Sequence, residues 1–523
     1  MKLDELLKGI GLVERAGPQD VDVTDVRDDS RRVTPGDLFV ALPAAVAGQP
    51  DGTAANIAAA VAAGARALVV ESGATVPAGF AGAVVTVPRV RSVLGPLAAN
   101  RFPRGRELTL TAVTGTNGKT TTTYLLESIL GAAGIVSGVV GTVAYRVGGG
   151  PGSTDAPAFM QSASLTTPGA LALQRMLADM REVGATDAVM EATSLALDQG
   201  RLDGCRFRVA GFTNLTQDHL DHHHTMAAYF DAKAILFERL LDDAAGVAVL
   251  PIDRPEGVAM RAHVRGRRPV ITVAAHGQPG ADVVVEGLSA SSAGTHATLR
   301  TPIGPLQVDS PLVGAFNLEN IVLAVGMAIA RGLGAEAIVT GLRRLPGVPG
   351  RLEPVANDRG VLCVVDYAHT PDGLERAIEA VRPLVAPGAR LITMFGCGGD
   401  RDRSKRPLMG EVAARDSDLA IVTSDNPRTE DPDAIVAMIV EGVRRQAVPA
   451  IEPAALATSA RGACVIVDRR KAIQAAVGAA KAGDVLLLAG KGHEDYQILG
   501  TERVHLDDRE EARAAFAAAG AAS

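Results

Sequence analysis

The chain has 523 residues, 47% of them hydrophobic and 21% charged, so it is long enough for roughly three globular domains and too apolar to be disordered. Its net charge of −7, its 3% aromatic content and its lack of tryptophan argue against a nucleic-acid-binding surface, which needs a basic face and stacking rings. The four cysteines form no CxxC pair, so we expect buried, reduced thiols rather than a zinc site or a disulfide framework.

The N-terminal stretch MKLDELLKGIGLVERAG carries acidic residues among its apolar positions and lacks the apolar core of a signal peptide. No apolar run in the sequence reaches the ~18 residues that a membrane-spanning helix needs. We therefore expect a cytoplasmic protein without membrane insertion.

Residues 1–105 are expected to form a first α/β domain. Its apolar runs predict three strands and one helix, at Val21–Val26, Leu38–Leu42, Ala67–Glu71 and Ile57–Gly64. The segment Thr34–Asp37 reads TPGD and predicts a turn. Ser30 and the loop that begins at Gln49 could bind a polar ligand, although a structural role is the simpler interpretation.

A phosphate-binding pattern opens the second region, residues 106–345. Leu110–Thr114 alternates as a buried strand does, GTNGKTT follows, and a helical pattern comes next. Glycine-rich loops and helix N-termini bind phosphate through backbone N–H groups, while Lys119 suits the terminal phosphates and the Thr120 hydroxyl suits Mg²⁺. The outer glycine lies three residues before Gly118 rather than five, but the strand and the helix around the loop favour nucleotide binding.

Two further strands of this region end in polar residues, and the strand–helix alternation indicates a mostly parallel sheet. Ala188–Glu191 ends in an acid, and Ala210–Leu215 runs into TQDHLDHHH. Ligands bind at the carboxyl ends of parallel strands, so Glu191 and His219 join Thr120 as candidate Mg²⁺ ligands. For each residue alone, a cap or a turn remains the default interpretation.

Two helices are predicted beside these strands. LTTPG at 165–169 has the composition of a helix N-terminus, and Met226–Leu240 places Tyr229, Lys233 and Phe237 on one face. A helical lysine is by default a surface residue, and its ammonium cannot bind Mg²⁺. Carbamylation by CO₂ would turn Lys233 into a carboxylate-like ligand, for which the residue pattern alone gives little support.

Residues 346–523 resume the alternation after a Pro- and Gly-rich linker at 345–351. Four strands and a helix are predicted, at Val361–Tyr367, Leu391–Phe395, Leu419–Thr423, Val485–Ala489 and Asp372–Val381. The last three strands end in the polar loops GCGGDRDR, SDNPR and GKGHE, which should meet at one sheet edge as a ligand crevice.

Together these motifs resemble the Mur ligase family. The resemblance covers nearly the whole chain, in the family's order: DSRRVTPGDLFVAL, TGTNGKTTT, LTTPG, MEATSLALDQGR, FTNLTQDHLDHH, YFDAKAILF, VPGRLE, VVDYAHTPDGL, GCGGDRDRSKRPLMG, SDNPRTEDP and AGKGHEDYQI. It implies an α/β protein of three domains: an N-terminal UDP-binding domain at 1–105, a central P-loop ATPase domain with a mostly parallel sheet at 106–345, and a C-terminal Rossmann-like, amino-acid-binding domain at 346–523.

The resemblance also implies roles for residues at matching positions. ATP would be bound by Gly115, Thr116, Asn117, Gly118, Lys119, Thr120, Thr121, Asn214, Arg351 and Asp366. The UDP-muramoyl-dipeptide would be bound by Ser30, Gln49, Thr166, Thr167, Thr193, Gln199 and Arg201. The incoming amino acid would be bound by Arg401, Asp425, Asn426, Pro427, Arg428, Gly490 and Glu494. Catalysis would fall to Lys119, Glu191, His219 and Lys233, with Mg²⁺ held by Thr120, Glu191, His219 and Lys233 as its carbamate (N6-carboxylysine).

The implied activity is an ATP-dependent amide ligation in peptidoglycan precursor synthesis. It adds meso-diaminopimelate to the D-Glu γ-carboxylate of UDP-N-acetylmuramoyl-L-alanyl-D-glutamate through an acyl phosphate. Diaminopimelate carries a second carboxylate that lysine lacks, and the planar guanidinium of Arg428 suits that group. The resemblance implies only these small-molecule partners, with no nucleic acid and no membrane, and a monomer.

Three alternatives remain open on the sequence: the same reaction with L-lysine, a folate-polyglutamate-forming ligase, and a catalytically silent nucleotide-binding relative. Arg428 argues against lysine, and the UDP-domain motif argues against the folate enzyme. Two positions depart from the family pattern, because Leu195 and Thr53 stand where histidines are usual. These departures leave the contacts to the sugar nucleotide open.

Overall fold

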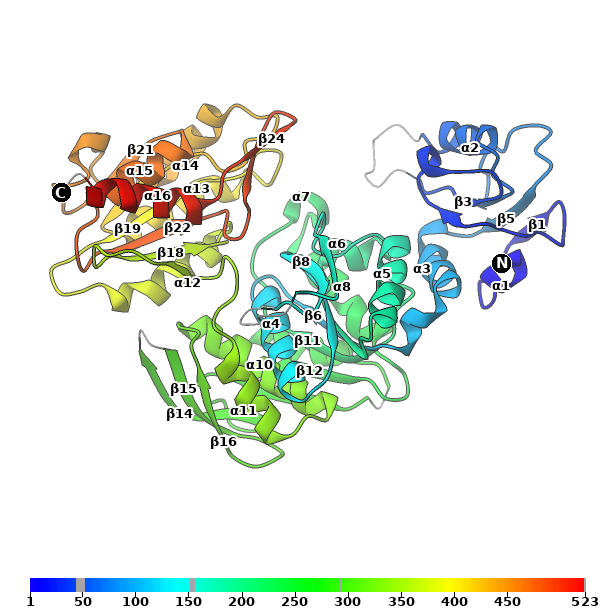
Figure 1. Cartoon of the computed structure of the whole chain (residues 1–523), viewed down its shortest axis with the longest axis horizontal. Coiled ribbons are helices and arrows are strands. Elements are labelled where there is room, and N and C mark those ends of the chain that lie inside the picture. The colour runs from blue at the N-terminus through cyan, green and yellow to red at the C-terminus, as the bar shows by residue number, and fades with distance from the viewer. Residues whose placement is uncertain (44–51, 151–155, 267, 292–293, 522–523) are drawn as a thin grey trace.

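The structure, a computed structural model, describes residues 1–43, 52–150, 156–266, 268–291 and 294–521. Within these residues it contains three sheets that each have their own helices, together with a separate two-stranded hairpin (Figure 1). In Figure 1 the N-terminal lobe (blue) and the C-terminal lobe (yellow to red) lie on opposite sides of a middle lobe (cyan to green), with the termini far apart. Within the described residues, no helix is long and apolar enough to cross a membrane. The four cysteines are free and buried, as predicted.

The N-terminal sheet has five strands, in the order β1 (Glu14–Ala16), β5 (Ala83–Val87), β4 (Ala67–Glu71), β3 (Leu38–Val40) and β2 (Val26–Arg27). All pairs are parallel except β1 with β5. Side chains alternate across the sheet, so Leu38 and Val69 pack under α3 (Val90–Arg101), while Phe39 and Leu68 pack under α2 (Thr53–Ala62). The predicted strands at Leu38–Leu42 and Ala67–Glu71 and the predicted helix are thus confirmed, with small shifts at their ends.

The prediction of a strand over Val21–Val26 is wrong. Only Val26 and Arg27 pair with a neighbouring strand, and upstream there is a single bridge at Asp22. Val21, Val23 and Val26 are nevertheless all buried in the N-terminal core. The alternating apolar residues of this segment therefore indicate that one face is buried, and do not indicate a hydrogen-bonded strand.

The middle sheet has eleven strands. Their order is β16 (Leu306–Ser310), β15 (Gly294–Arg300), β14 (Val283–Ser291), β13 (Val270–Ala274), β12 (Val247–Pro251), β11 (Phe207–Phe212), β6 (Thr109–Thr114), β10 (Asp187–Glu191), β7 (Ser137–Val140), β8 (Ala144–Val147) and β9 (Phe159–Ser162). The pairs from β14 to β7 are parallel, and the pairs outside them are antiparallel. The sheet is mostly parallel, as predicted.

Helices cover both faces of the middle sheet. Val113 and Val189 pack against α4 (Lys119–Ala132), α10 (Ala315–Arg331) and α11 (Ala335–Arg344). Ala112 and Met190, which are their chain neighbours, pack against α5 (Ala170–Glu182) and the end of α8 (Met226–Ile235). Burial of each large apolar side chain stabilises the fold by about 1.5–3 kcal/mol, so both cores fix the strand ends from which the site is built. Shorter helices are α6 (Ser194–Asp198), α7 (Leu220–His223) and α9 (Pro255–Met260).

Two helix predictions for this domain had different outcomes. The helix predicted over Met226–Leu240 is confirmed, as α8 followed by a π-helical turn. The N-cap predicted from LTTPG is wrong, because α5 begins after Gly169 without a side-chain cap. The Thr167 hydroxyl instead donates to the backbone oxygen of Glu191 at 2.7 Å, which ties this loop to the end of β10.

The C-terminal sheet has six strands, in the order β17 (Glu353–Val355), β18 (Leu362–Asp366), β22 (Val485–Ala489), β19 (Leu391–Phe395), β20 (Leu419–Val422) and β21 (Gly462–Val465). Only β17 pairs antiparallel. The four predicted strands and helix α12 (Pro371–Val381) are confirmed, and β22, β19 and β20 are neighbours. Their polar loops therefore meet at one edge. The other elements are α13 (Lys405–Asp416), α14 (Pro432–Arg445), α15 (Arg469–Ala479), α16 (Asp508–Ala521) and the hairpin of β23 (Tyr496–Leu499) and β24 (Glu502–His505).

Candidate active site

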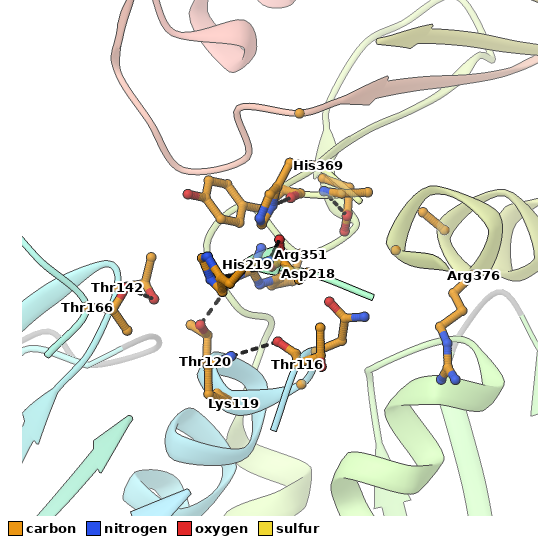
Figure 2. Close-up of a pocket in the computed structure, with 18 of the residues that line it drawn as sticks. Thr116, Lys119, Thr120, Thr142, Thr166, Asp218, His219, Arg351, His369 and Arg376 are labelled. Atoms are coloured by element: carbon orange, nitrogen blue, oxygen red, sulfur yellow. Dashed lines mark hydrogen bonds and ion pairs between the residues drawn. The ribbon is translucent and has the colours of Figure 1, made fainter. Parts of the chain in front are cut away.

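A cleft of about 370 Å³ lies where the carboxyl ends of the middle and C-terminal strands face each other. Figure 2 shows Lys119 and Thr120 on one side of it and His369, from the C-terminal domain, on the other. Many of the predicted site residues line this cleft: Thr116, Asn117, Gly118, Lys119, Thr120, Thr121, Thr166, Glu191, Thr193, Asn214, His219, Arg351, Asp366, Arg401, Asp425, Asn426, Arg428, Gly490 and Glu494.

The loop between β6 and α4 has the backbone that a phosphate site needs. Gly115 and Gly118 have φ of 142° and 86°, and a Cβ on either would lie within about 2 Å of a neighbouring side-chain oxygen, at 1.8 and 2.2 Å. Only glycine fits these positions. The loop is held by Asn117 N–H, which donates to Asn214 Oδ1 at 3.0 Å. Lys119 Nζ donates to the carbonyl oxygens of Gly115 and Thr116, at 2.9 and 2.7 Å.

Glu191 is a buried carboxylate, 1% exposed, at the end of β10. It accepts hydrogen bonds from the Thr120 hydroxyl at 3.0 and 3.1 Å and from the Thr142 N–H and hydroxyl at 2.8 and 3.0 Å. Within the described chain, Glu191 forms no ion pair. A carboxylate and a hydroxyl in contact are oxygen donors of the kind that Mg²⁺ prefers, so these residues fit the predicted metal.

The described residues contain no group of three or more His, Cys, Asp and Glu that could hold a metal ion. The predicted ligand set contains only two such residues, Glu191 and His219, and depends otherwise on a hydroxyl and a modified lysine. His219 has a left-handed backbone, with φ of 54°, and its Nε2 lies 3.5 Å from Asp218 Oδ2. His222 and His223 contact Asp198 and Ser194 at 2.9 and 3.0 Å. Both lie in the short helix α7, and His223 is buried.

Lys233 is 1% exposed, so the default interpretation of a surface lysine is wrong. The predicted face of α8 is buried, and Lys233 Nζ lies 4.0 Å from the centre of the Tyr229 ring. The same nitrogen donates to Gly115 O at 2.9 Å, directly behind the phosphate loop. Burial and the nearby Lys119 cation hold the pKa of Lys233 well below its ordinary value.

The residues predicted to bind the UDP-muramoyl-dipeptide fall into two groups. Thr166 and Thr193 line the cleft, and Thr167 lies behind them, with its carbonyl accepting from Arg201 at 2.9 Å. Arg201 in turn donates to Gln199 Oε1 at 3.0 and 2.6 Å. Ser30 is in the N-terminal domain, where its hydroxyl lies 3.3 Å from the Asn56 amide oxygen. Gln49 lies outside the described residues.

The C-terminal loops present charged groups to the cleft. Asn426 donates to Glu494 at 2.8 Å, and Arg428, at φ of 52°, donates to Gly399 O at 2.7 Å. Asp425 Oδ2 lies 3.0 Å from where a Cβ on Gly490 would be. Burial and the Asp425 carboxylate raise the pKa of Glu494. Pro427 does not line the cleft, but its carbonyl accepts from Glu430 N–H at 3.1 Å and helps to shape the loop.

Arg351 and Asp366 connect the two domains. Arg351 donates to the Thr120 hydroxyl at 3.2 Å and lies over the Tyr367 ring, 4.7 Å from its centre. Asp366 accepts from the N–H groups of Leu352 and Ala368, both at 2.8 Å, so it fixes the backbone around Arg351. Burial raises the pKa of Asp366.

Sequence reasoning missed several residues of the cleft, among them Thr142, Asn320, His369, Arg376 and Lys405. Asn320 carried a usable signal, because it follows Asn317 by about one turn in an otherwise apolar helical run, and buried amides in such a run need partners. The other four come from loops or helix surfaces that only the fold brings together.

Domain contacts across the cleft were also not predictable from the sequence. Asn117 of the phosphate loop donates to Asp372 of α12 at 2.7 Å. Arg376, one turn further along α12, donates to Asp372 at 3.1 Å and to Glu319 of α10 at 3.3 Å. The phosphate loop is therefore in direct contact with the C-terminal domain.

Comparison with known proteins agrees with this geometry. Residues 113–328 match the family model described as the Mur ligase middle domain, and residues 350–492 match the one described as the Mur ligase glutamate ligase domain. The UDP-N-acetylmuramoyl-L-alanyl-D-glutamate–2,6-diaminopimelate ligase of Gloeobacter violaceus is 47% identical over 99% of this chain and 98% of its own length. That of Geobacter metallireducens is 44% identical, with 99% and 98% covered.

Solved structures show the same fold. A structure titled as a UDP-N-acetylmuramoyl-L-alanyl-D-glutamate–2,6-diaminopimelate ligase is 35% identical, covers 99% of both chains and has a TM-score of 0.67. The folylpolyglutamate synthase of Mycobacterium tuberculosis complexed with ADP is 18% identical, with a TM-score of 0.60 over 76% of this chain and 91% of its own, and it shares the fold alone. With close relatives along its whole length and both family models matched, the chain belongs to the Mur ligase family.

Proposed function

We propose that the chain is an ATP-dependent ligase that adds meso-diaminopimelate to the D-Glu γ-carboxylate of UDP-N-acetylmuramoyl-L-alanyl-D-glutamate in peptidoglycan precursor synthesis. The observation that carries this proposal is one cleft with a phosphate loop on one wall and paired acidic and guanidinium groups on the other. The names of the relatives that match over nearly the whole chain supply the substrates.

The first wall suits phosphoryl transfer to a carboxylate. The γ-carboxylate of the dipeptide would attack the γ-phosphorus of ATP, giving an acyl phosphate and ADP. Two anions meet in this step, and Lys119, with the N–H groups of its loop, lies where it offsets their charge. Thr120 and Glu191, with His219 and carbamylated Lys233, would hold Mg²⁺, which supplies further positive charge when bound. Asn214, Arg351 and Asp366 support the loop and the domain junction on which ATP would lie.

The second wall suits diaminopimelate. The far end of this amino acid carries a carboxylate and an ammonium. Arg428 is opposite in charge to the carboxylate, and Asp425 and Glu494 are opposite in charge to the ammonium. Arg401 would bind the carboxylate at the reacting end. The free amine then attacks the acyl carbon, and the bond between that carbon and the phosphate oxygen breaks. Phosphate leaves, and solvent takes up the proton that the amine releases. Contacts such as Asn117 with Asp372 bring the walls together and limit access of water to the acyl phosphate.

The UDP-linked substrate and ATP are cytoplasmic compounds, and we propose that the enzyme acts there as a monomer on small molecules alone. Ser30 and Gln49 would contact the UDP group, and Thr166, Thr167, Thr193, Gln199 and Arg201 the muramoyl-dipeptide. The domain boundaries at 105/106 and 345/346 stay a prediction.

The direct test is product formation from UDP-N-acetylmuramoyl-L-alanyl-D-glutamate and ATP, followed by mass spectrometry with either meso-diaminopimelate or L-lysine. We expect a tripeptide product with diaminopimelate only. Product with lysine would retain the ligase and overturn the specificity. No product with either, in protein shown to be folded, would favour a catalytically silent relative.

Arg428→Ala should weaken the use of diaminopimelate far more than the use of ATP. Loss of a charge-assisted hydrogen bond costs about 1.5–3 kcal/mol, so the KM for diaminopimelate should rise roughly 10- to 100-fold. Arg403→Ala is the matched control, because Arg403 is largely exposed and pairs with Glu430 at 3.1 Å away from the cleft. Equal losses in apparent affinity for both substrates in Arg428→Ala would contradict the assignment.

Lys233→Ala should abolish activity, since it removes the amine that CO₂ would carbamylate. Added bicarbonate should have no effect on the variant, whereas acetate or propionate could enter the vacated space and restore part of the rate. Steady-state assays of both proteins with each additive test this, and the wild-type protein should gain nothing from acetate. Full activity of the variant would rule out the metal role.

A further inference from the structure

Two buried Arg–Asp pairs lie at opposite ends of the C-terminal sheet, and one of them is directly beneath the amino-acid wall of the cleft. Arg469, the first residue of α15, and Asp508, the first residue of α16, both have fully buried side chains. Arg469 Nε donates to Asp508 Oδ1 at 2.8 Å, and Nη2 donates to Oδ2 in a bidentate pair. Neither residue lines the cleft, and the ligation chemistry gives them no role.

The same guanidinium also holds two strand ends. Its Nη2 donates to Ala489 O at 3.0 Å and its Nη1 to Ser424 O at 3.4 Å. Ala489 is the last residue of β22 and immediately precedes Gly490, while Ser424 immediately precedes Asp425. Because β19 lies between β20 and β22, no backbone ladder joins these two ends directly. Arg469 is thus a bridge between the loops that carry Asp425 and Glu494.

The charge of Arg469 also acts on the cleft. Burial alone would lower its pKa, but the carboxylates of Asp508, Asp425 and Glu494 outweigh it and raise that pKa. Lys491 is the other buried cation nearby, with Nζ 3.4 Å from Glu494 Oε2. Two buried cations thus lie beneath the carboxylates of the cleft wall. Without Arg469 the carboxylates facing the cleft would lose a nearby opposite charge.

We propose that Arg469 is a positioning residue for the amino-acid substrate, which sets the spacing and the charge of Asp425 and Glu494 from beneath. The inference rests on the proposed function, since it assumes that these carboxylates bind the far ammonium of diaminopimelate. Lysine could not replace it, because only the planar fork of arginine reaches a carboxylate and two carbonyl oxygens at once.

The second pair supplies a matched control. Arg390 pairs with Asp484 at 2.7 Å and donates to the carbonyl oxygens of Leu456, Ser459 and Ala479, at 2.9, 3.0 and 2.8 Å. It precedes β19 and Asp484 precedes β22, so the pair bridges the same sheet at the edge away from the cleft. Arg390→Lys therefore removes a comparable buried network without touching the amino-acid site.

The test compares Arg469→Lys with Arg390→Lys and the wild-type protein, measuring Tm and the KM for each substrate. Both variants should lose thermal stability. Only Arg469→Lys should raise the KM for diaminopimelate, by roughly tenfold or more as site carboxylates shift, with the KM for ATP within about twofold. A KM for diaminopimelate that is unchanged, or that rises equally in both variants, would overturn the proposal.

If Arg469→Lys does not fold, Asp508→Asn replaces it, since the amide keeps the volume of the side chain but loses its charge and one of the two oxygens that accept from Arg469. It frees Arg469 to shift toward Asp425 and Glu494, so the KM for diaminopimelate should again change selectively, and an unchanged KM overturns the proposal. A wild-type protein without diaminopimelate-dependent product formation would instead overturn the proposed function. The two failures are thereby distinguished.

Discussion

Two neighbouring lysines, the buried Lys233 and the half-buried Lys119, share one acceptor in this structure, and the phosphate loop is built around that contact. Lys119 and Lys233 both donate to the carbonyl oxygen of Gly115, each at 2.9 Å. Two ammonium groups this close repel each other, and burial disfavours the charged form of each. Burial lowers the pKa of both side chains, and Glu191 and Asp218 partly oppose this for Lys119. This arrangement suits the proposal of a phosphate bound by Lys119 and a carbamylated Lys233.

The rest of the cleft follows from where this loop lies. β6 is the central strand between β10 and β11, so Glu191 and the polar run after β11 are brought to the loop from either side. The C-terminal sheet presents the equivalent edge from across the cleft, and Arg351 and Asp372 join the two at 3.2 and 2.7 Å. In the proposed function, one wall would bind phosphate and the other an amino acid, and the reaction requires both in one place.

Much of this arrangement could be predicted because its signals are local. Glycines that must adopt positive φ, strands with period-two patterns, and acids or loops at strand ends are all visible in short stretches of sequence. The same patterns failed where burial and pairing differ: Val21 and Val23 are buried without a ladder, and Thr167 contacts β10 rather than capping α5. Lys233 could not be placed from its own helix, because its burial comes from the phosphate loop, which is distant in sequence.

Residues such as Arg376, Lys405 and Arg469 could not be predicted for a related reason. Arg376 and Arg469 contact Glu319 and Asp508, which lie on other elements. A lone arginine or lysine in a helical pattern carries no information about such contacts. Asn320 is the exception, since two amides one turn apart in an apolar helix indicate a buried polar contact. The polar residues at strand ends can thus be predicted from the sequence. The groups that hold those strand ends in position cannot.

The central claim is that the cleft activates a carboxylate by phosphorylation and then passes it to an amine. Labelling both oxygens of the D-Glu γ-carboxylate with ¹⁸O tests it most directly, with the released phosphate and the amide product analysed by mass spectrometry. An acyl-phosphate route requires one labelled oxygen to leave in the phosphate and the other to remain in the amide. Phosphate free of ¹⁸O, released while the amide forms, would contradict the account.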